Sequence, residues 1–241
     1  MRQLIGVGVG PGDPELVTVK AVRVLRDADL VLVPVLADDE PGRAEATVQA
    51  HVGHDRVRRV VFALNERTDS ARREAAWDAA ADTVVAAFGD GAETVAFATI
   101  GDPNVYSTFT YLAQTVRARL PEVATPTIPG VTAMQDLAAR SGTVLSEGSE
   151  TLALFPMTAG VERFQAALAA FDTVVAYKGG RQLPRMLEAV ERAGRLDTAV
   201  YGASLGLTDE DVRPAAEMTG PAPYLSTVLV PGRRSGRGGR L

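Results

Sequence analysis

The stretch Gly6-Val7-Gly8-Val9-Gly10-Pro11-Gly12-Asp13-Pro14 closes the first apolar run of the chain, residues 4–9, and opens its first helical pattern, residues 15–29. A β-branched run follows at residues 30–35, so the order of elements is strand, helix, strand. Strands joined through a helix predict a right-handed crossover and a parallel sheet. The glycines let bare backbone approach a ligand, although a tight structural connection is the alternative explanation.

The same alternation of short apolar strands and amphipathic helices continues along the chain, and three prolines fall between residues 121 and 129. Prolines at this density suit a boundary better than the interior of an element. We therefore predict an α/β fold of two lobes, each a mostly parallel or mixed sheet with flanking helices and with the active site in the cleft between them. The expected parts are an N-terminal α/β domain at 1–125, a C-terminal α/β domain at 126–231 and a disordered basic tail at 232–241.

Composition narrows the class of protein. The formal net charge of −5 argues against a surface built for nucleic acid. The chain has no cysteine, so it has no disulfide, no thiolate nucleophile and no cysteine-based zinc site. No signal-peptide pattern or membrane-length apolar stretch is present, and we expect a cytoplasmic protein. The two histidines, His51 and His54, are expected to meet carbonyls at a helix end rather than a metal.

Two nucleotide-binding motifs fail at the glycine turn. In a G-x-G-x-x-G register the last glycine is replaced by Pro11 when counting from Gly6 and by Asp13 when counting from Gly8. The second strand also lacks an acidic residue at its end for a ribose. A P-loop requires a Gly-Lys pair, and the chain has none.

Two later turns resemble the first in position. The segment Gly101-Asp102-Pro103-Asn104-Val105-Tyr106-Ser107-Thr108 follows a predicted strand, and so does Pro129-Gly130-Val131-Thr132-Ala133. Ligands of open parallel sheets bind outside the carboxyl ends of the strands. Three distant segments are therefore predicted to form one site. Asp102 is expected either to hydrogen-bond the ligand or to cap the following helix.

The three turns together, with Tyr106 five residues after Gly101, resemble the tetrapyrrole methylase family over essentially the whole chain except the tail. Within that family, the Tyr106-Ser107-Thr108-Phe109 stretch is similar to the precorrin-2 C20-methyltransferases, with the cobalt-factor II C20-methyltransferases a close second. Gly42-Arg43-Ala44 and Tyr177-Lys178-Gly179-Gly180-Arg181 are similar to the same subgroup.

The resemblance implies a homodimer that binds S-adenosylmethionine, methylates a small-molecule tetrapyrrole and releases S-adenosylhomocysteine. It implies cofactor contacts from all three turns and from the second lobe, at Pro11, Gly101, Asp102, Val105, Tyr106, Thr132, Ala133, Lys178, Ala203 and Thr227. Lys178 stands where many relatives have Met. No membrane or nucleic-acid partner is expected.

Methyl transfer from a sulfonium is a direct displacement, so no nucleophilic side chain is expected and no catalytic residue is assigned. The implied substrate carries many carboxylates, which arginines grip in bidentate fashion. The candidates are Arg43, Arg58, Arg59 and Arg181, each of which is otherwise a solvated surface charge. Other readings stay open: another ring position, uroporphyrinogen III, a macromolecular acceptor, or a non-catalytic sensor.

Overall fold

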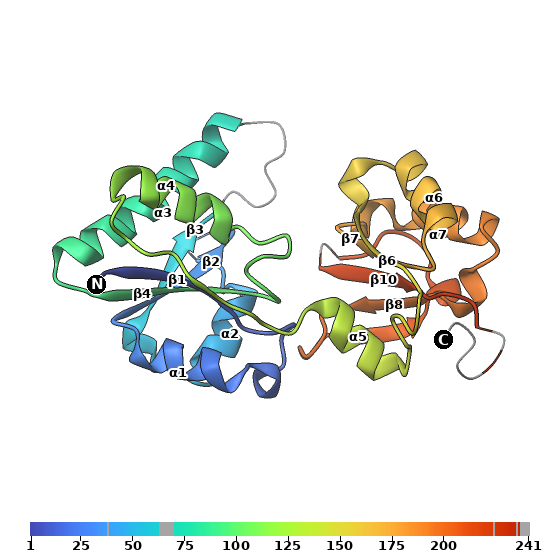
Figure 1. Cartoon of the computed structure of the whole chain (residues 1–241), viewed down its shortest axis with the longest axis horizontal. Coiled ribbons are helices and arrows are strands. Elements are labelled where there is room, and N and C mark those ends of the chain that lie inside the picture. Colours follow the sequence, from blue (N-terminus) through green and yellow to red (C-terminus); the bar gives the residue numbers. More distant parts are fainter. Residues whose placement is uncertain (38, 63–69, 224, 235, 237–241) are drawn as a thin grey trace. The chain divides into compact units, whose positions relative to one another are not determined.

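The computed structural model describes residues 1–37, 39–62, 70–223, 225–234 and 236, and it divides into two compact units, Met1–Thr132 and Ala133–Leu241 (Figure 1). Each unit contains one five-stranded sheet with helices against it. The α/β class predicted from the sequence is confirmed.

The first unit is built on a sheet with strand order β3-β2-β4-β1-β5, in which every pair of neighbours is parallel. Its strands are β1 (Gln3–Gly8), β2 (Leu30–Val35), β3 (Val57–Val61), β4 (Thr94–Thr99) and β5 (Thr127–Ile128). Its helices are α1 (Val19–Asp27), α2 (Arg43–Gln49), α3 (Ser70–Gly89) and α4 (Phe109–Arg119), with short 3-10 turns at η1 (Pro14–Leu16) and η2 (His54–Arg56).

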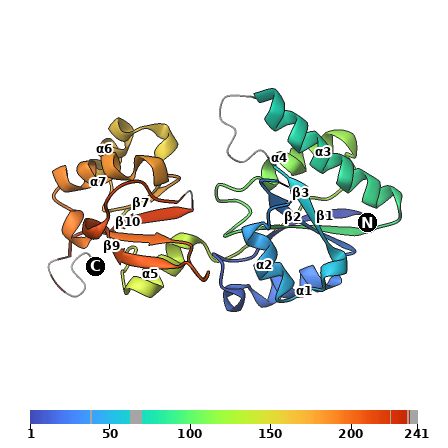
Figure 2. The same ribbon diagram turned by 180° about the vertical axis from the view of Figure 1, so that it is seen from behind.

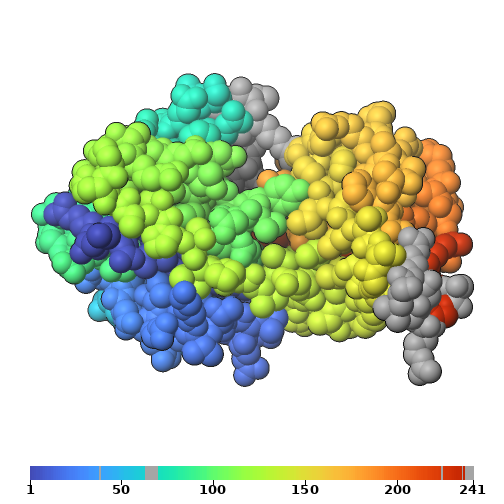
Figure 3. Space-filling view, viewed as in Figure 1, coloured from blue at the N-terminus to red at the C-terminus, as the bar shows by residue number. Residues whose placement is uncertain are grey.

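Both faces of this sheet are covered, as a parallel sheet requires. Leu4 and Leu32 point to a core shared with α3 and α4, whereas their neighbours Ile5 and Val31 point to a core shared with α1 and α2. Figures 1 and 2 show the two helix pairs on opposite faces, and in the space-filling view the green atoms of α4 lie above the blue atoms of α1 (Figure 3). The alternation of strand side chains sets this division.

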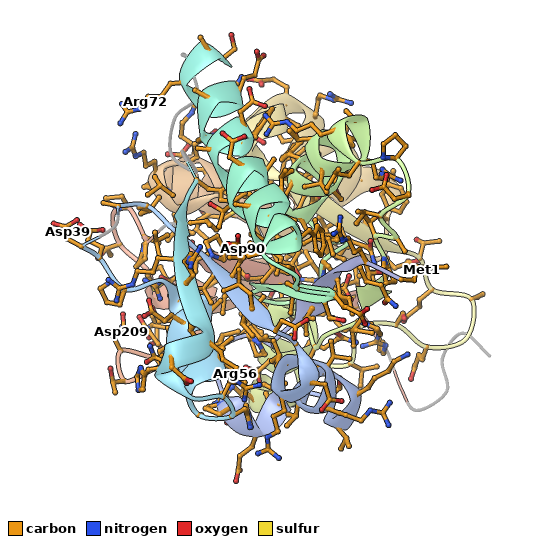
Figure 4. The ribbon with its side chains drawn as sticks, turned by 90° about the vertical axis from the view of Figure 1, so that its left-hand side faces the viewer. Met1, Asp39, Arg56, Arg72, Asp90 and Asp209 are labelled. Carbon is orange, nitrogen blue, oxygen red and sulfur yellow. The ribbon has the colours of Figure 1, made fainter. Side chains whose placement is uncertain are left out.

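The loop before β3 is tied to the end of α1. Arg56, labelled in Figure 4, donates from its guanidinium to the backbone carbonyls of Arg26 and Ala28. Nearby, the carboxylate of Asp29 accepts the backbone N–H groups of Glu93 and Thr94, both at 2.9 Å. These N–H donors lower the pKa of Asp29. The amino ends of β2 and β4 are thereby held in register.

The second unit has a mixed sheet with order β6-β7-β10-β8-β9, in which β6 and β7 are parallel and β10 is antiparallel to both β7 and β8. Its strands are β6 (Leu152–Pro156), β7 (Thr173–Tyr177), β8 (Val200–Ala203), β9 (Asp211–Pro214) and β10 (Ser226–Val230). Its helices are α5 (Ala133–Ser141), α6 (Val161–Ala170) and α7 (Leu183–Arg192), with 3-10 turns η3 (Met157–Ala159), η4 (Gly180–Gln182), η5 (Leu196–Thr198) and η6 (Ala215–Glu217). Helices α6 and α7 pack on one face and α5 on the other.

The division between the units falls seven residues after the boundary expected at 125/126. The reason is β5, whose Thr127 and Ile128 pair with Gly6 and Val7 of β1 and so keep the segment in the first unit. This pairing joins residues far apart in sequence, and the proline density around it does not reveal it.

The first residues of the expected tail, 232–234, have partners on the second unit. The backbone N–H of Gly232 donates to the Thr173 hydroxyl at 3.0 Å, Arg233 pairs with Asp197, and Arg234 pairs with Glu150. These three residues are held on the second unit because backbone and guanidinium groups find partners there. Residues 235 and 237–241 of the predicted tail lie outside the described residues.

None of the helices in the described segments combines the length and apolarity needed to cross a bilayer. Among the same residues, no group of three or more His, Asp or Glu side chains is arranged to hold a metal ion.

Candidate functional site

All five strands of the first unit run in one direction, so the segments after β1, β4 and β5 lie at one edge of the sheet. These segments are the three turns singled out in the sequence. The first and second are joined directly, because the N–H of Gly101 donates to the carbonyl of Gly10 at 2.8 Å. The three turns therefore meet at one edge of the sheet, as predicted from the sequence.

The turns approach so closely that only glycine fits at the contact points. A Cβ on Gly8 would lie 2.6 Å from the Gly101 carbonyl oxygen and 2.6 Å from the Gly130 nitrogen. A Cβ on Gly130 would lie 2.2 Å from the same Gly101 oxygen and 2.8 Å from the Gly8 Cα. All four distances are far below ordinary van der Waals contact. One glycine from each turn therefore forms a shared backbone junction, which we call the glycine junction (Gly8, Gly101, Gly130).

Asp102 uses both carboxylate oxygens to hold this junction. Oδ1 accepts the backbone N–H of Asn104 at 2.8 Å, and Oδ2 accepts the backbone N–H of Gly130 at 3.0 Å. The start of α4 is served instead by Ser107, whose Oγ accepts the N–H of Phe109 at 3.1 Å. The expected helix-capping role of Asp102 at α4 is therefore replaced by a cross-link between the second and third turns.

Gly6 of β1 makes room for the ring of Phe109, the residue at which the second turn leads into α4. A Cβ on Gly6 would lie 2.5 Å from the Phe109 ring, so the absence of a side chain in β1 makes room for that ring. The Ser107 hydroxyl also lies 3.1 Å from the hydroxyl of Thr99, at the end of β4. Ser107 and Phe109 thus fix the path of the second turn on both sides of Thr108.

Tyr106 has a backbone conformation that non-glycine residues rarely adopt, with φ of 52°. The residue is 41% exposed, and partial burial raises the pKa of its phenol. The phenol therefore stays neutral near pH 7. Of the other predicted cofactor contacts in this unit, Pro11, Gly101 and Thr132 are buried and Val105 is half-buried.

The predicted contacts of the second unit fall on three neighbouring strands. Thr227 of β10 pairs with Tyr177 of β7 on one side and with Gly202 of β8 on the other. Lys178 and Ala203 follow directly after these two partners in the sequence. Because β10 is antiparallel to both neighbours, all three lie at one sheet edge.

This second edge also contains two left-handed residues. Lys178 has φ of 59° and Ser204, directly after β8, has φ of 50°. Such conformations cost energy in residues other than glycine and cluster at functional sites. Ser204 is buried and its hydroxyl donates to Asp209 at 2.9 Å. Ser204 was not among the predicted site residues, since nothing in the sequence pattern indicates a left-handed serine. Ala133, the remaining predicted contact, is the first residue of α5.

The four candidate substrate arginines have different positions. Arg43 begins α2, and Arg181 lies in η4; both are exposed. Arg58 and Arg59 lie within β3, three and two residues before its last residue. Arg59 pairs with the buried Glu45 of α2 at 2.8 Å. The structure thus gives Arg59 an internal partner, and both arginines lie on the outermost strand of the sheet, separated from β1 by β2 and β4.

Helix α2 and the turn that follows it contribute two side chains that were not predicted to belong to the site. The Thr47 hydroxyl donates to the carbonyl of Gly12 at 3.0 Å, and the His51 ring nitrogen Nε2 lies 3.0 Å from the carbonyl of Pro14. His51 was expected to meet carbonyls at a helix end, and the carbonyl it meets belongs to the first turn instead. The i, i+4 spacing of Thr47 and His51 in the sequence is the signal that could have paired them, although His51 lies two residues beyond the end of α2.

Comparisons of the chain with a protein-family model and with individual proteins agree with one another. A family model described as "Tetrapyrrole (Corrin/Porphyrin) Methylases" matches residues 3–218. The chain is 35% identical over 238 residues to a precorrin-2 C(20)-methyltransferase of Sinorhizobium sp, covering 95% of both chains. It is 31% identical over 232 residues to a cobalt-precorrin-2 C(20)-methyltransferase of Salmonella typhimurium, again covering 95% of both.

Among solved structures, the fold is similar to that of a uroporphyrin-III C-methyl transferase from Thermus thermophilus complexed with S-adenosyl homocysteine. The TM-score is 0.63 at 20% sequence identity, with 94% of this chain and 96% of the other covered. At this identity the likeness concerns the fold alone.

Proposed function

Because the chain belongs to the tetrapyrrole (corrin/porphyrin) methylases, we propose that it methylates precorrin-2 at C20, with S-adenosylmethionine as methyl donor, in corrin-ring biosynthesis. The glycine junction is the observation that carries the proposal, because it presents bare backbone from three turns at one sheet edge. The choice of precorrin-2 is supported by the relative from Sinorhizobium, which matches along nearly the whole chain. Methylation of the cobalt-bound counterpart is the second candidate, supported by the relative from Salmonella.

The donor would be held by the residues that the sequence resemblance implied. In the first unit these are Pro11, Gly101, Asp102, Val105, Tyr106 and Thr132, and in the second unit Ala133, Lys178, Ala203 and Thr227. Their chemistry fits a zwitterionic nucleoside ligand, since the turns offer backbone N–H and C=O groups and Tyr106 offers a neutral hydroxyl. Because Asp102 has both oxygens engaged by backbone N–H groups, we propose that it supports donor binding by shaping the turns.

The proposed reaction needs orientation rather than a nucleophilic side chain. S-adenosylmethionine supplies a methyl group on a positively charged sulfur, and the acceptor carbon must approach it in line. Holding two reactants in such geometry contributes about 7–11 kcal/mol in well-oriented systems. The rigid glycine junction suits this role, because its backbone atoms cannot shift without breaking contacts among three turns.

Arg181 and Arg43 are the proposed partners of the substrate carboxylates, since both are exposed and neither lies within a sheet strand. Arg181→Ala is expected to raise the KM for the tetrapyrrole more than it lowers kcat. Arg117→Ala, at an exposed position of α4, is the matched control. An unchanged KM in the Arg181 variant removes this residue from the substrate site.

The deciding experiment is incubation of the purified protein with S-adenosylmethionine and either precorrin-2 or cobalt-factor II. The expected result is S-adenosylhomocysteine, a product one methyl group heavier and methylation at C20. Methylation at another carbon refutes the choice of acceptor position and leaves the family intact. Binding of the donor without turnover supports the alternative of a non-catalytic sensor.

We further propose that the protein acts in the cytoplasm as a homodimer, as the family resemblance implies. Light scattering of the purified protein tests the dimer, and a monomer mass at micromolar concentration contradicts it.

A further inference from the structure

Helix α2 and the turn directly after it contact the first turn at two points, four residues apart in the sequence. Thr47 is fully buried, and its hydroxyl donates to the carbonyl of Gly12. His51 follows four residues later, and its Nε2 lies 3.0 Å from the carbonyl of Pro14. A carbonyl oxygen can only accept, so Nε2 is the donor in this hydrogen bond.

The helix itself is fixed on the sheet. The carboxylate of Glu45 accepts the N–H of Gly42 at 3.1 Å at the helix start, and it pairs with Arg59 of β3 at 2.8 Å. Val48 is fully buried in the core beneath the helix. A Cβ on Gly42 would lie 2.6 Å from the carbonyl of Pro34 in β2, so the approach to the helix is also tightly packed. Thr47 therefore sits on a rigid support, and His51 follows two residues after the end of the same helix.

The first turn needs such support because its own backbone is permissive. Gly10 has a left-handed φ of 76°, and glycine loses more conformational freedom on ordering than any other residue. The bond from Gly101 fixes the carbonyl of Gly10, at the start of the turn. Thr47 and His51 fix the carbonyls of Gly12 and Pro14, which flank its far end.

We propose that Thr47 and His51 are positioning residues for the methyl donor, acting through the turn from Gly10 to Pro14. This inference rests on the proposed function, in which Pro11 of that turn contacts S-adenosylmethionine. Neither residue touches the reacting atoms. Each holds one backbone carbonyl so that the turn is already in its binding conformation before the donor arrives.

The expected kinetic consequence differs from that of a catalytic residue. When an anchor is lost, only a fraction of molecules has the turn in its competent form, and the apparent Kd rises in inverse proportion to that fraction. Saturating donor restores the competent form. The KM for S-adenosylmethionine therefore rises while kcat stays unchanged.

The test measures S-adenosylhomocysteine binding by calorimetry, together with KM and kcat for the donor. Thr47→Val keeps the shape and removes the hydroxyl, and we expect about tenfold weaker binding from the loss of one buried hydrogen bond. Thr47→Ser keeps the donor and is expected to bind within about twofold of the wild type.

The histidines supply a matched pair. His51→Phe removes the donor and is expected to weaken binding about tenfold, whereas His51→Gln keeps an N–H donor and restores much of the affinity. His54→Phe, at the other histidine and in an exposed position, is expected to leave binding unchanged.

A purely structural role would lower the melting temperature of Thr47→Val and His51→Phe while leaving Kd and KM at wild-type values, and this result overturns the proposal. If Thr47→Val does not fold, the comparison of His51→Phe with His54→Phe decides the question. Equal affinity in those two variants also overturns it. Failure of the proposed function is recognised separately, because the wild-type protein would then bind no S-adenosylhomocysteine.

Discussion

Replacing Gly130 with alanine tests whether the three turns hold one another rigidly in place. The new Cβ would lie 2.2 Å from the carbonyl oxygen of Gly101 and 2.8 Å from the Cα of Gly8. Ordinary contacts between such atoms begin at about 3.5 Å, so the second turn has to move by roughly 1 Å. Backbone atoms surround the site, and no flexible side chain can turn away to make room.

The cost follows from what this movement disturbs. Overpacking in a close-packed region costs about 1–3 kcal/mol. The displacement also strains the hydrogen bond from Gly101 to Gly10 at 2.8 Å and the one from Gly130 to Asp102 at 3.0 Å, each contributing about 1 kcal/mol. We therefore expect the free energy of unfolding to fall by about 2–4 kcal/mol. Donor affinity is expected to fall at least about tenfold, because the displaced backbone carries the proposed contacts.

Urea unfolding measures the stability, and calorimetry with S-adenosylhomocysteine measures the affinity. Gly89→Ala is the matched control, since it ends α3 and a Cβ there meets nothing within 4 Å. That variant is expected to be neutral or more stable by up to about 1 kcal/mol. If Gly130→Ala matches Gly89→Ala in both stability and affinity, the three turns do not form a rigid unit.

Three further changes test other parts of the structure. Arg195 donates to five backbone carbonyls, so Arg195→Met is expected to lower the free energy of unfolding by about 3–5 kcal/mol in urea titration, and a loss below about 1 kcal/mol contradicts this role. Burial opposes ionisation of Glu45, but Arg59 and the N–H of Gly42 outweigh this effect and lower the pKa of Glu45. The ionised carboxylate therefore stabilises the fold at pH values above the ordinary carboxyl pKa of about 4.3. The stability advantage of wild type over Glu45→Gln should be complete at pH 7 and shrink as the pH falls below about 4, and a constant difference across that range refutes the assignment. Arg140 pairs with Glu210 at 2.8 Å, so Arg140→Met is expected to speed amide exchange in residues 204–210 but not in the first unit, and unchanged exchange rates count against this anchor.

The architecture and the three turns could be predicted because their signals are local. A glycine or proline turn after a β-branched run is visible in the residues themselves, and a parallel sheet brings the carboxyl ends of its strands to one edge. The second-unit contacts Lys178, Ala203 and Thr227 followed only from the family resemblance. Strand pairing places all three at one edge of the second sheet, although no residue pattern in that half of the chain announces it.

The features that the sequence did not reveal depend on contacts between residues that are far apart in the chain. Strand β9 contains Asp211, Arg213 and Pro214, and charged residues and proline are typical of an edge strand rather than of the apolar runs that predict strands. Arg59 looked like a free surface charge because its partner Glu45 lies fourteen residues away on a helix. Charge alone cannot distinguish an arginine that binds a substrate from one that anchors a helix.

Among the residues that the structure describes, three other than glycine have a left-handed backbone, and they illustrate the same limit. Tyr106, Lys178 and Ser204 each lie in the segment that follows a strand, and each costs about 1–2 kcal/mol relative to an ordinary conformation. Glycine would adopt these conformations without that cost, yet the chain has a side chain at all three positions. A stable fold does not require this arrangement, whereas a site that needs particular side chains at the ends of its strands does. The strain at Tyr106 and Lys178 therefore favours a binding role for these two segments, independently of sequence resemblance, whereas the buried Ser204 uses its hydroxyl within the fold to bind Asp209.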